Sequence, residues 1–142
     1  MIISDCKCEN IYGIYELLKN ELGKNVTVGT LENRIDKMLG DSDYKIFVAE
    51  SNDETVGFIG VHFGLAFEID GRVMRIIALA VKEEYQNKGI GTALVKTVEE
   101  YAQQNGVTVI GVNSGLQRLP AHSFYEKQGF YKKGYSFIKS LE

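Results

Sequence analysis

Residues 79–94 of this chain read LAVKEEYQNKGIGTAL, and they decide how the rest of the sequence is interpreted. The first three residues are apolar and typical of a buried strand, whereas the last part has the apolar spacing of an amphipathic helix. Gly89 and Gly91 lie in the turn between them, and they let an anion approach the backbone without a Cβ in the way. Because a helix N-terminus stabilises negative charge, the stretch predicts a site for a phosphorylated ligand.

The composition places the chain among ordinary globular proteins. It has 142 residues, of which 44% are hydrophobic and 25% charged, and we expect one domain over residues 1–142 that buries a core. No apolar run reaches the ~20 residues of a membrane span and no secretory signal pattern begins the chain, so we expect a cytoplasmic protein without membrane contact. The 16 basic residues are scattered, which argues against a nucleic-acid partner, and the net charge of −3 is compatible with a cationic small substrate.

The cysteines and histidines lack the spacing of a metal site. Cys6 and Cys8 are too close in sequence for an ordinary structural disulfide, and no second cysteine pair completes a zinc site. His62 and His122 are far apart in sequence and form no HExxH pattern. We therefore expect no metal, and we interpret the two cysteines as residues of a first strand.

Hydrophobic periodicity predicts helices and strands along the whole chain. Helices are expected over 10–22, 30–39, 92–105 and 120–128, and strands over 1–8, 45–50, 55–67, 72–81, 107–113, 130–133 and 135–140. Glycines follow the first three of these helices and are typical of helix C-termini. Thr30 is the expected N-cap of the second helix, and Leu39 is expected on its inner face. Pro120 suits the first turn of the last helix.

The order of these elements predicts the fold class. Asp70 and Gly71 are typical of a hairpin turn, so strand 72–81 is expected to run antiparallel to the strand before it. A helix separates 72–81 from 107–113, and these two strands are therefore expected to pair in parallel through a right-handed crossover. We expect an α/β fold, an α+β sandwich in which helices cover both faces of a mixed, mostly antiparallel sheet.

Two common phosphate-binding motifs do not fit the glycine turn. A Walker A loop requires GxxxxGK[ST], but Leu94 stands where its second glycine is required. A dinucleotide fold requires a small residue at the position of Leu94 and an acidic residue at the end of the next strand, where Asn113 stands. An isolated GxG is more often only a tight turn. Here Gln86, Lys88 and Thr92 add side-chain donors for phosphate oxygens.

Two stretches resemble the signatures of a known family. Residues 86–94, QNKGIGTAL, are similar to the [QR]xxGxG[AG]xL acetyl-CoA loop of the GNAT superfamily of N-acetyltransferases. Residues 79–85, LAVKEEY, resemble the family's LxVxPEY lead-in, except that Lys82 replaces the usual proline, one place earlier or later. Residues 121–130, AHSFYEKQGF, are similar to its second signature, AxxFYEKxGF. The two signatures have the family's order and spacing, and the resemblance covers most of the chain.

The resemblance implies that acetyl-CoA is a co-substrate and that one parallel strand pair splays apart to receive it. The pantetheine arm is expected along the backbone of 79–81, where an N–H near Leu79 faces the thioester oxygen. Tyr125 corresponds to the usual general acid, a phenol that is protonated at neutral pH because its ordinary pKa is near ~10; a core aromatic beside Phe124 is the alternative interpretation. The residues expected to bind acetyl-CoA are Leu79, Ala80, Val81, Gln86, Asn87, Lys88, Gly89, Ile90, Gly91, Thr92, Asn113 and Arg118.

The general base is the role for which the sequence offers no match. Many relatives carry Glu or Asp on the strand that ends in LxV, but residues 76–78 are Ile-Ile-Ala here. The remaining candidates are His62, Glu68 and water relayed by backbone carbonyls. His62 has a suitable ordinary pKa, although a lone histidine on a strand is more often structural. A carboxylate beside a hairpin, such as Glu68, usually faces solvent.

A third stretch narrows the resemblance. Residues 114–125, SGLQRLPAHSFY, are similar to the SGxxRxxAHxFY pattern of a subset that includes aminoalkylphosphonate-type acetyltransferases, and Arg118 and His122 fit that pattern. Contact with the coenzyme, capping of the neighbouring strand end and a solvated surface position all suit Arg118.

The leading hypothesis is an acetyl-CoA-dependent N-acetyltransferase that acts on a primary amine of a small molecule or peptide by direct attack in a ternary complex. The alternative is a GNAT-fold module that binds CoA as a sensor or interaction domain without turnover, which the absent strand carboxylate favours and Tyr125 opposes. Polyamines, amino acids, aminoglycosides and a peptide N-terminus fit equally well as acceptor. A homodimer is left open because relatives often dimerise.

Overall fold

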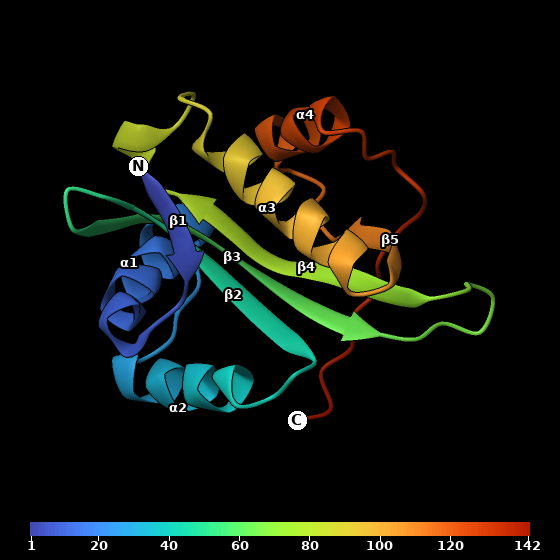
Figure 1. The fold of residues 1–142 in the computed structure, drawn as a ribbon, viewed down its shortest axis with the longest axis horizontal. Coiled ribbons are helices and arrows are strands. Elements are labelled where there is room, and N and C mark those ends of the chain that lie inside the picture. Colours follow the sequence, from blue (N-terminus) through green and yellow to red (C-terminus); the bar gives the residue numbers. More distant parts are fainter.

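The computed structural model describes residues 1–142 and contains one five-stranded sheet in the order β1-β2-β3-β4-β5. The strands are β1 (Ile2–Asp5), β2 (Tyr44–Ser51), β3 (Glu54–Gly64), β4 (Arg72–Val81) and β5 (Val107–Val112). The helices are α1 (Ile11–Leu22), α2 (Val28–Leu39), α3 (Ile90–Gln104) and α4 (Leu119–Lys127), with short 3-10 turns η1 (Cys8–Asn10) and η2 (Glu83–Tyr85). Figure 1 shows α1 and α2 on one side of the sheet and α3 and α4 on the other.

The sheet is mixed, as the sequence predicts. Strands β1 to β4 pair antiparallel, and β4 pairs in parallel with β5 after the crossover through α3. Asn52 and Asp53 have positive φ angles of 51° and 63°, the conformation of a tight hairpin between β2 and β3. The expected fold class is therefore confirmed. None of the helices combines the length and the apolar character that crossing a lipid bilayer demands.

Each face of the sheet carries its own apolar core. On β2, Phe47 and Ala49 pack in the cluster that contains the buried residues of α3, whereas Ile46 and Val48 pack in the cluster of α1 and α2. This alternation is what a strand buried on both faces produces. The apolar residues of 92–105 recur at helical spacing, which predicts one inner face; Leu94, Val95, Val98 and Ala102 of that face are buried, and Tyr101 is partly buried.

A bulge in β4 reverses which side chains face which core. Gly60 pairs with Ala78 and Val61 pairs with Ile76, so Ile77 is an extra residue in the strand. Before it, Met74 and Ile76 lie in the α3 core; after it, Ala78 and Ala80 contact the α1/α2 core. Ile77 itself stays 38% exposed. The bulge thus turns small side chains toward α1 and α2 at the end of β4.

Several expected boundaries were wrong near the first half of the chain. Thr27, not Thr30, caps α2, and its hydroxyl accepts from the Thr30 N–H at 3.1 Å. Leu39 is exposed at the end of α2 rather than inward. Cys6 and Cys8 follow β1 instead of belonging to it, because β1 ends at Asp5. For the cap, Thr27 and Thr30 are both residue types that accept helix N–H groups, so local sequence does not choose between them.

Two further expectations fail at the sheet margins. β3 was expected to reach Phe67 but ends at Gly64, since nothing covers the side chains beyond it and Phe67 is fully exposed. The apolar composition of residues 107–113 predicts a buried strand, but β5 forms an edge of the sheet and Val109 is 41% exposed. Strand propensity alone does not reveal whether a neighbouring strand or helix covers a segment.

The predicted strands over 130–133 and 135–140 do not form. No strand or helix follows α4, and residues 131–142 are exposed throughout. The alternation of apolar side chains in this segment is strand-like, but a strand also requires a neighbour that receives its backbone hydrogen bonds. In this structure the segment has no such neighbour: no hydrogen bond joins residues 131–142 to the rest of the molecule, although β5 is an edge strand.

Candidate functional site

The turn before α3 exposes a row of unbonded N–H groups. Asn87 and Gly89 have positive φ angles of 61° and 87°, and α3 begins at Ile90 without a side-chain cap. The first backbone N–H of this region that finds a partner is that of Ala93, which donates to the Gly89 carbonyl at 3.0 Å. The N–H groups of the residues from Asn87 to Thr92 form no hydrogen bond within the chain. We call residues 86–92 the elbow; its geometry is that of an anion-binding nest at a helix N-terminus.

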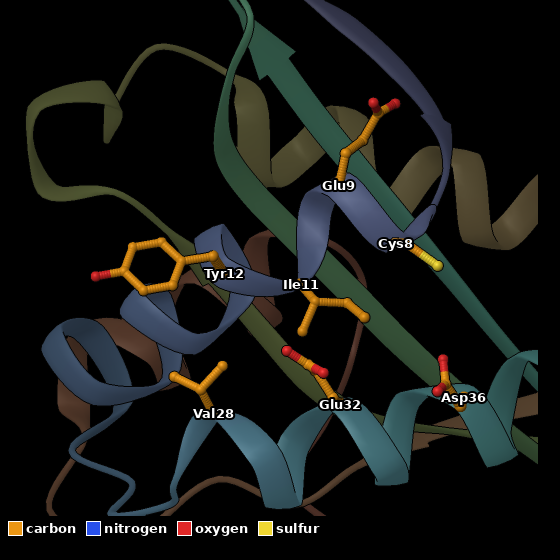
Figure 2. Close-up of a pocket in the computed structure, with 7 residues that line it drawn as sticks. All are labelled: Cys8, Glu9, Ile11, Tyr12, Val28, Glu32 and Asp36. Atoms are coloured by element: carbon orange, nitrogen blue, oxygen red, sulfur yellow. The ribbon is translucent and has the colours of Figure 1, made fainter.

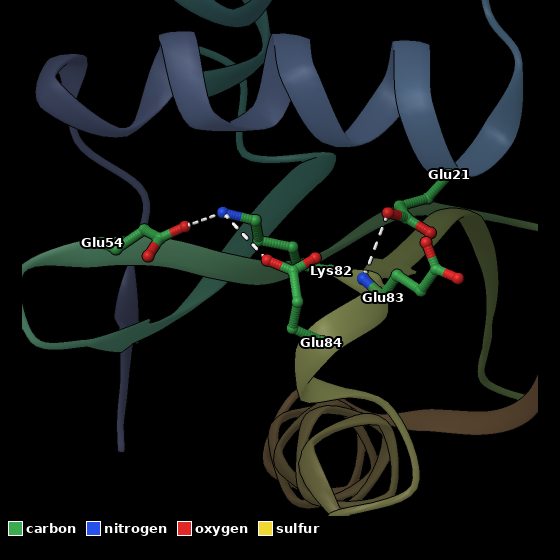
Figure 3. A network of polar contacts seen from close by, with 5 residues as sticks. All are labelled: Glu21, Glu54, Lys82, Glu83 and Glu84. Atoms are coloured by element: carbon green, nitrogen blue, oxygen red, sulfur yellow. Dashed lines mark hydrogen bonds and ion pairs between the residues drawn. The ribbon is translucent and has the colours of Figure 1, made fainter.

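One side chain of α1, that of Glu21, braces the chain just before the elbow and the elbow itself; Figure 3 shows its contact with Glu83. The Glu21 carboxylate accepts from the Glu83 N–H at 3.1 Å and from the Gln86 side-chain amide at 3.2 Å. The same amide donates to the Val81 carbonyl at 2.8 Å. Gln86 therefore closes the elbow back onto the end of β4, and its amide hydrogens are already engaged within the chain.

A second set of charges fixes the start of the turn. The Lys82 ammonium contacts the carboxylates of Glu54 on β3 and Glu84 on η2, as Figure 3 shows. The hydrogen bond to Glu54 raises the pKa of Lys82 above its ordinary value. The lysine stays charged, and it ties the turn to the hairpin between β2 and β3.

Beside the elbow, β4 and β5 part. The last paired residues of the parallel ladder are Ile76 and Val112, so the rest of β4 has no strand on that side. The Lys82 N–H donates to Val56 of β3 at 2.8 Å. Because successive residues of a strand direct their N–H groups to opposite edges, the N–H groups of Leu79 and Val81 point away from β3 toward the opening. We call the opening between β4 and β5 beyond these last paired residues the gap.

Tyr125 is buried on α4, which packs against the beginning of α3. The Gln128 amide donates to the Thr92 hydroxyl at 3.0 Å, and the ring of Phe124 would lie 3.2 Å from a Cβ at Gly91. The Tyr125 ring packs edge-on against Phe124 and Phe130. Burial raises the pKa of Tyr125 above its ordinary value, and the charge of Arg118 opposes this in part. The phenol is therefore protonated throughout the neutral range.

The loop from β5 to α4 carries the remaining predicted residues. His122 Nε2 lies 2.7 Å from the Gly115 carbonyl, so the histidine ties the loop to α4. Asn113 and Arg118 are exposed, and Arg118 directly precedes α4. Ser114 adds an observation that no sequence motif indicated: its Oγ is buried and has no hydrogen-bond partner.

The two side-chain candidates for a base lie apart from the elbow. His62 stacks on Tyr44, with ring centroids 4.6 Å apart, and pairs with Arg75 on β4. Leu79 pairs with Ile59 on β3, and His62 lies three residues further along that strand. At about 3.3 Å per residue, His62 is therefore about 10 Å from the level of Leu79. Glu68 is exposed in the loop before β4, at the end of the strand opposite to the elbow.

An apolar cavity of about 170 Å³ lies on the α1/α2 face, beside the bulge of β4. Ile77 and Ala78 contribute its β4 wall, directly before Leu79. Arg34 of α2 is the one charged residue among those that line it, and it makes no ion pair. The lining residues are Ile14, Leu18, Leu31, Arg34, Ile35, Met38, Ile46, Phe58, Gly60, Ile77 and Ala78.

A larger cavity of about 320 Å³ lies between η1, α1 and α2 (Figure 2). Three carboxylates, those of Glu9, Glu32 and Asp36, line it together with Tyr12. It has no residue from β4 or the elbow, and its acidic groups do not gather closely enough to hold a metal ion. The smaller cavity is therefore the one that belongs to the candidate site.

Comparison with known proteins agrees with this geometry. The profile described as "Acetyltransferase (GNAT) family" matches residues 11–130. Aminoalkylphosphonate N-acetyltransferase from Salmonella typhimurium is 28% identical over 134 residues, which cover 94% of this chain and 84% of that protein. N-acetyltransferase 8 from Homo sapiens is 33% identical over 97 residues, 65% of this chain, and the match spans only 40% of that relative's length.

Solved structures share the fold at low sequence identity. A transcriptional regulator from Bacillus halodurans C-125 superposes with a TM-score of 0.90 at 19% identity, covering 99% of each chain. A GNAT family acetyltransferase from Staphylococcus aureus superposes with a TM-score of 0.80 at 22% identity, covering 99% of this chain and 98% of the other. At these identities the two structures show that the fold is shared, and they show nothing about substrate.

Proposed function

Because this chain belongs to the acetyltransferase (GNAT) family, we propose that it transfers the acetyl group of acetyl-CoA to the primary amine of a small molecule or peptide. The observation that carries the proposal is the row of unbonded N–H groups over residues 87–92, next to the gap between β4 and β5. A CoA thioester has an anionic pyrophosphate, which the N–H groups of the elbow can bind, and an extended pantetheine arm, which can lie along β4 in the gap. The proposed ligand set is the one expected from the sequence, with Gln86 acting mainly as a brace of the elbow.

The reaction proceeds by direct attack. The amine nitrogen forms a bond to the thioester carbonyl carbon, the carbon–sulfur bond breaks, and the sulfur leaves with a proton while the amine loses one. The N–H of Leu79 points into the gap and stabilises the negative charge that develops on the carbonyl oxygen. Cys6 and Cys8 lie beyond β1 and far from the gap, which supports attack without a covalent acyl-enzyme.

Tyr125 donates the proton to the departing sulfur. Its raised pKa keeps the phenol protonated at the pH of the cell, as a donor must be. Packing of α4 against the start of α3 brings Tyr125 to the elbow side of the gap. For the proton of the amine, the geometry supports His62 or a relayed water better than Glu68, because Glu68 lies at the far end of β4.

The acceptor enters through the apolar cavity between α2 and the bulge of β4. Its wall leads along Ile77 and Ala78 to Leu79, where the acyl carbon is expected. Arg34 has no ion pair, so an acceptor that carries an anionic group at the end opposite its amine finds a partner there. The Salmonella relative is named for aminoalkylphosphonates, which have this chemistry.

The test is thiol release from acetyl-CoA with a panel of amines matched in length, with and without a phosphonate or carboxylate. We expect turnover with primary amines, a lower KM for the anionic ones, and loss of that preference in Arg34→Gln. Lys37→Gln on the same helix is the control, because Lys37 does not line the cavity. Tight acetyl-CoA binding with no thiol release from any amine would instead establish a CoA-binding module.

A further inference from the structure

Three polar side chains form a row across the sheet beside the apolar cavity. In the register of the strands, Tyr44 of β2 pairs with His62 of β3, and His62 pairs with Arg75 of β4. Residues paired in this way have Cβ atoms about 5 Å apart and share one face of the sheet. The rings of Tyr44 and His62 are in contact, with centroids 4.6 Å apart. We call Tyr44, His62 and Arg75 the polar row.

The polar row lies on the same face of the sheet as the apolar cavity. Met74 and Ile76 pack in the α3 core, so Arg75 between them points to the opposite face, where α1 and α2 lie (Figure 1). Residues two apart along a strand point the same way and are about 7 Å apart. Each member of the row is two positions along its own strand from a residue that lines the cavity: Tyr44 from Ile46, His62 from Gly60, and Arg75 from Ile77.

The polar groups of the row are free to bind a ligand. Arg75 forms no ion pair, and neither does Arg34, which lines the cavity from α2. The ring nitrogens of His62 and the hydroxyl of Tyr44 have no hydrogen-bond partner within the chain. Arg75 is exposed, and the two rings are half-buried. Two unpaired positive charges therefore flank one cavity, and an anion between them would be stabilised.

We propose that the polar row and Arg34 bind a doubly charged anion, a phosphonate or a phosphate monoester, at the end of the acceptor opposite its amine. This inference rests on the proposed function and names its acceptor class. Two guanidinium forks suit the three oxygens of a tetrahedral phosphonate, and the His62 ring N–H and the Tyr44 hydroxyl add neutral donors. A carboxylate has two oxygens and a single charge, so it satisfies the site less completely.

The placement of the row sets the length and the charge of the acceptor. His62 lies about 10 Å from the level of Leu79, where the acyl carbon is expected. A hydrogen bond of about 3 Å at the anion and an attack distance of about 3 Å at the amine leave roughly 4 Å between the two groups, which is a short chain. Polyamines and aminoglycosides carry further positive charges, which the two arginines repel. The binding role of His62 leaves a relayed water to take the proton of the amine.

The first experiment compares KM for three acceptors of matched length: an aminoalkylphosphonate, the corresponding amino carboxylate and a neutral alkylamine. We expect the lowest KM for the phosphonate and the highest for the neutral amine. Arg75→Gln should raise the ratio of the phosphonate KM to the neutral-amine KM at least ~10-fold, and Arg75→Lys should restore part of the preference because it keeps the charge but not the fork.

Lys96→Gln is the control for Arg75→Gln. Lys96 is exposed on α3, on the opposite side of the sheet, and removing its charge should leave the KM ratio unchanged. An unchanged ratio in Arg75→Gln overturns the proposal. An equal fall in kcat for all three acceptors, with the ratio kept, overturns it as well, because a group that binds the distant anion acts on KM for the anionic acceptors.

The second experiment does not need acetyl transfer. The chain has two histidines, so the imidazole NMR signals of His62 and His122 can be followed separately during a titration with methylphosphonate. We expect the His62 signal to shift to saturation, while His122, which contacts the Gly115 carbonyl, stays in place. In Arg75→Gln the dissociation constant obtained from the His62 shift should rise at least ~10-fold.

The titration separates failure of this inference from failure of the proposed function. No shift of His62, a shift confined to His122, or a His62 shift that Arg75→Gln does not weaken overturns the anion site. A saturable His62 shift in a chain that releases no thiol with any amine supports the anion site and contradicts only the proposed acetyl transfer.

Discussion

The elbow and residues 131–142, which we call the C-terminal segment, both leave groups without partners, but the groups differ in kind. The elbow leaves backbone N–H groups unbonded while Glu21 and Lys82 hold its framework in place. The C-terminal segment leaves apolar side chains and a complete set of backbone groups uncovered, and nothing in the chain holds it. Unbonded N–H donors on a braced turn fit a small anion, whereas exposed apolar side chains on an extended segment favour burial against another apolar surface. The kind of group left unpaired thus indicates the kind of partner.

The largest expected effect lies at Gly91, where the elbow meets α4. In Gly91→Val, the new side chain collides with Phe124, whose ring lies 3.2 Å from the Cβ position, and displaces the N–H groups around it. Losing two charge-assisted hydrogen bonds of about 2 kcal/mol each would weaken acetyl-CoA binding by about 1,000-fold. Calorimetry measures the affinity.

Gly29→Val provides the matched control for Gly91→Val. Gly29 is also the second residue of a helix, α2, and a Cβ there meets nothing within 4 Å. It should leave binding unchanged. If both variants bind alike, the elbow has no special role and its contrast with the C-terminal segment disappears.

The next effect concerns Tyr125, which lies between the two regions because its ring packs against Phe130. Tyr125→Phe keeps the buried ring and removes the proton donor, so kcat should fall about 100-fold while acetyl-CoA affinity stays within twofold. Tyr101→Phe is the control, since Tyr101 packs in the same core against Phe47 and Phe63 but away from the gap. An unchanged kcat removes Tyr125 from the chemistry.

A smaller effect compares two glycines at opposite ends of α3. Gly89 and Gly106 have φ angles of 87° and 73°, and a Cβ at either meets no atom within 4 Å. Alanine at each position costs about 1 kcal/mol of folding free energy through backbone strain. Only Gly89→Ala should also weaken acetyl-CoA binding, by about tenfold, because only there does a ligand approach the backbone. Melting temperatures and binding isotherms of the two variants separate strain from recognition; equal affinities would count against the elbow as a phosphate site.

Local sequence patterns predicted most helices and strands, because the turns and helix ends that bound these elements depend on residues close together in the sequence. The Asp70-Gly71 turn, the glycine after α1 and the glycines around α3 mark hairpins and helix ends through backbone conformation alone. The elbow was predictable for the same reason. Thr27 and Thr30 are both residue types that cap helices well and lie three residues apart, so the local sequence did not determine which of them begins α2.

The features that sequence reasoning missed depend on distant parts of the chain. Glu21 and Gln86 are 65 residues apart, and no local pattern announces their contact. The bulge at Ile77 changes the face of Ala78 and Ala80, although a shift in apolar alternation within strand 72–81 was a readable signal. The strands predicted beyond Phe130 have the right composition, but the structure does not pair them with another strand, and local propensity does not reveal whether such pairing forms.

Glu21 offers a modest test of how much the brace matters. Glu21→Gln keeps the shape of the side chain but removes the charge that receives the Glu83 N–H and the Gln86 amide. A looser elbow should bind acetyl-CoA about threefold less tightly, since an exposed hydrogen bond of this kind contributes about 0.5–1 kcal/mol. Glu16→Gln makes the same change on an exposed turn of the same helix and should have no effect. Equal affinities would show that the elbow holds its shape unaided.

The smallest effect is an absence of change with pH. Burial raises the pKa of Tyr125 above its ordinary value near ~10, so the folded protein holds the phenolic proton more tightly than the unfolded chain does. The stability that this contributes is present below pH ~10 and is lost as the pH rises through the folded pKa. The proton donor therefore stays protonated from pH 7 to ~9, a full unit below the ordinary phenol pKa, and kcat should show no descending limb in that range. Arg118 lowers the pKa in part, so Arg118→Gln should move any alkaline limb further upward. A descending limb near pH 8 that Tyr125→Phe abolishes would contradict the raised pKa and would mean that the charge of Arg118 outweighs the effect of burial on Tyr125.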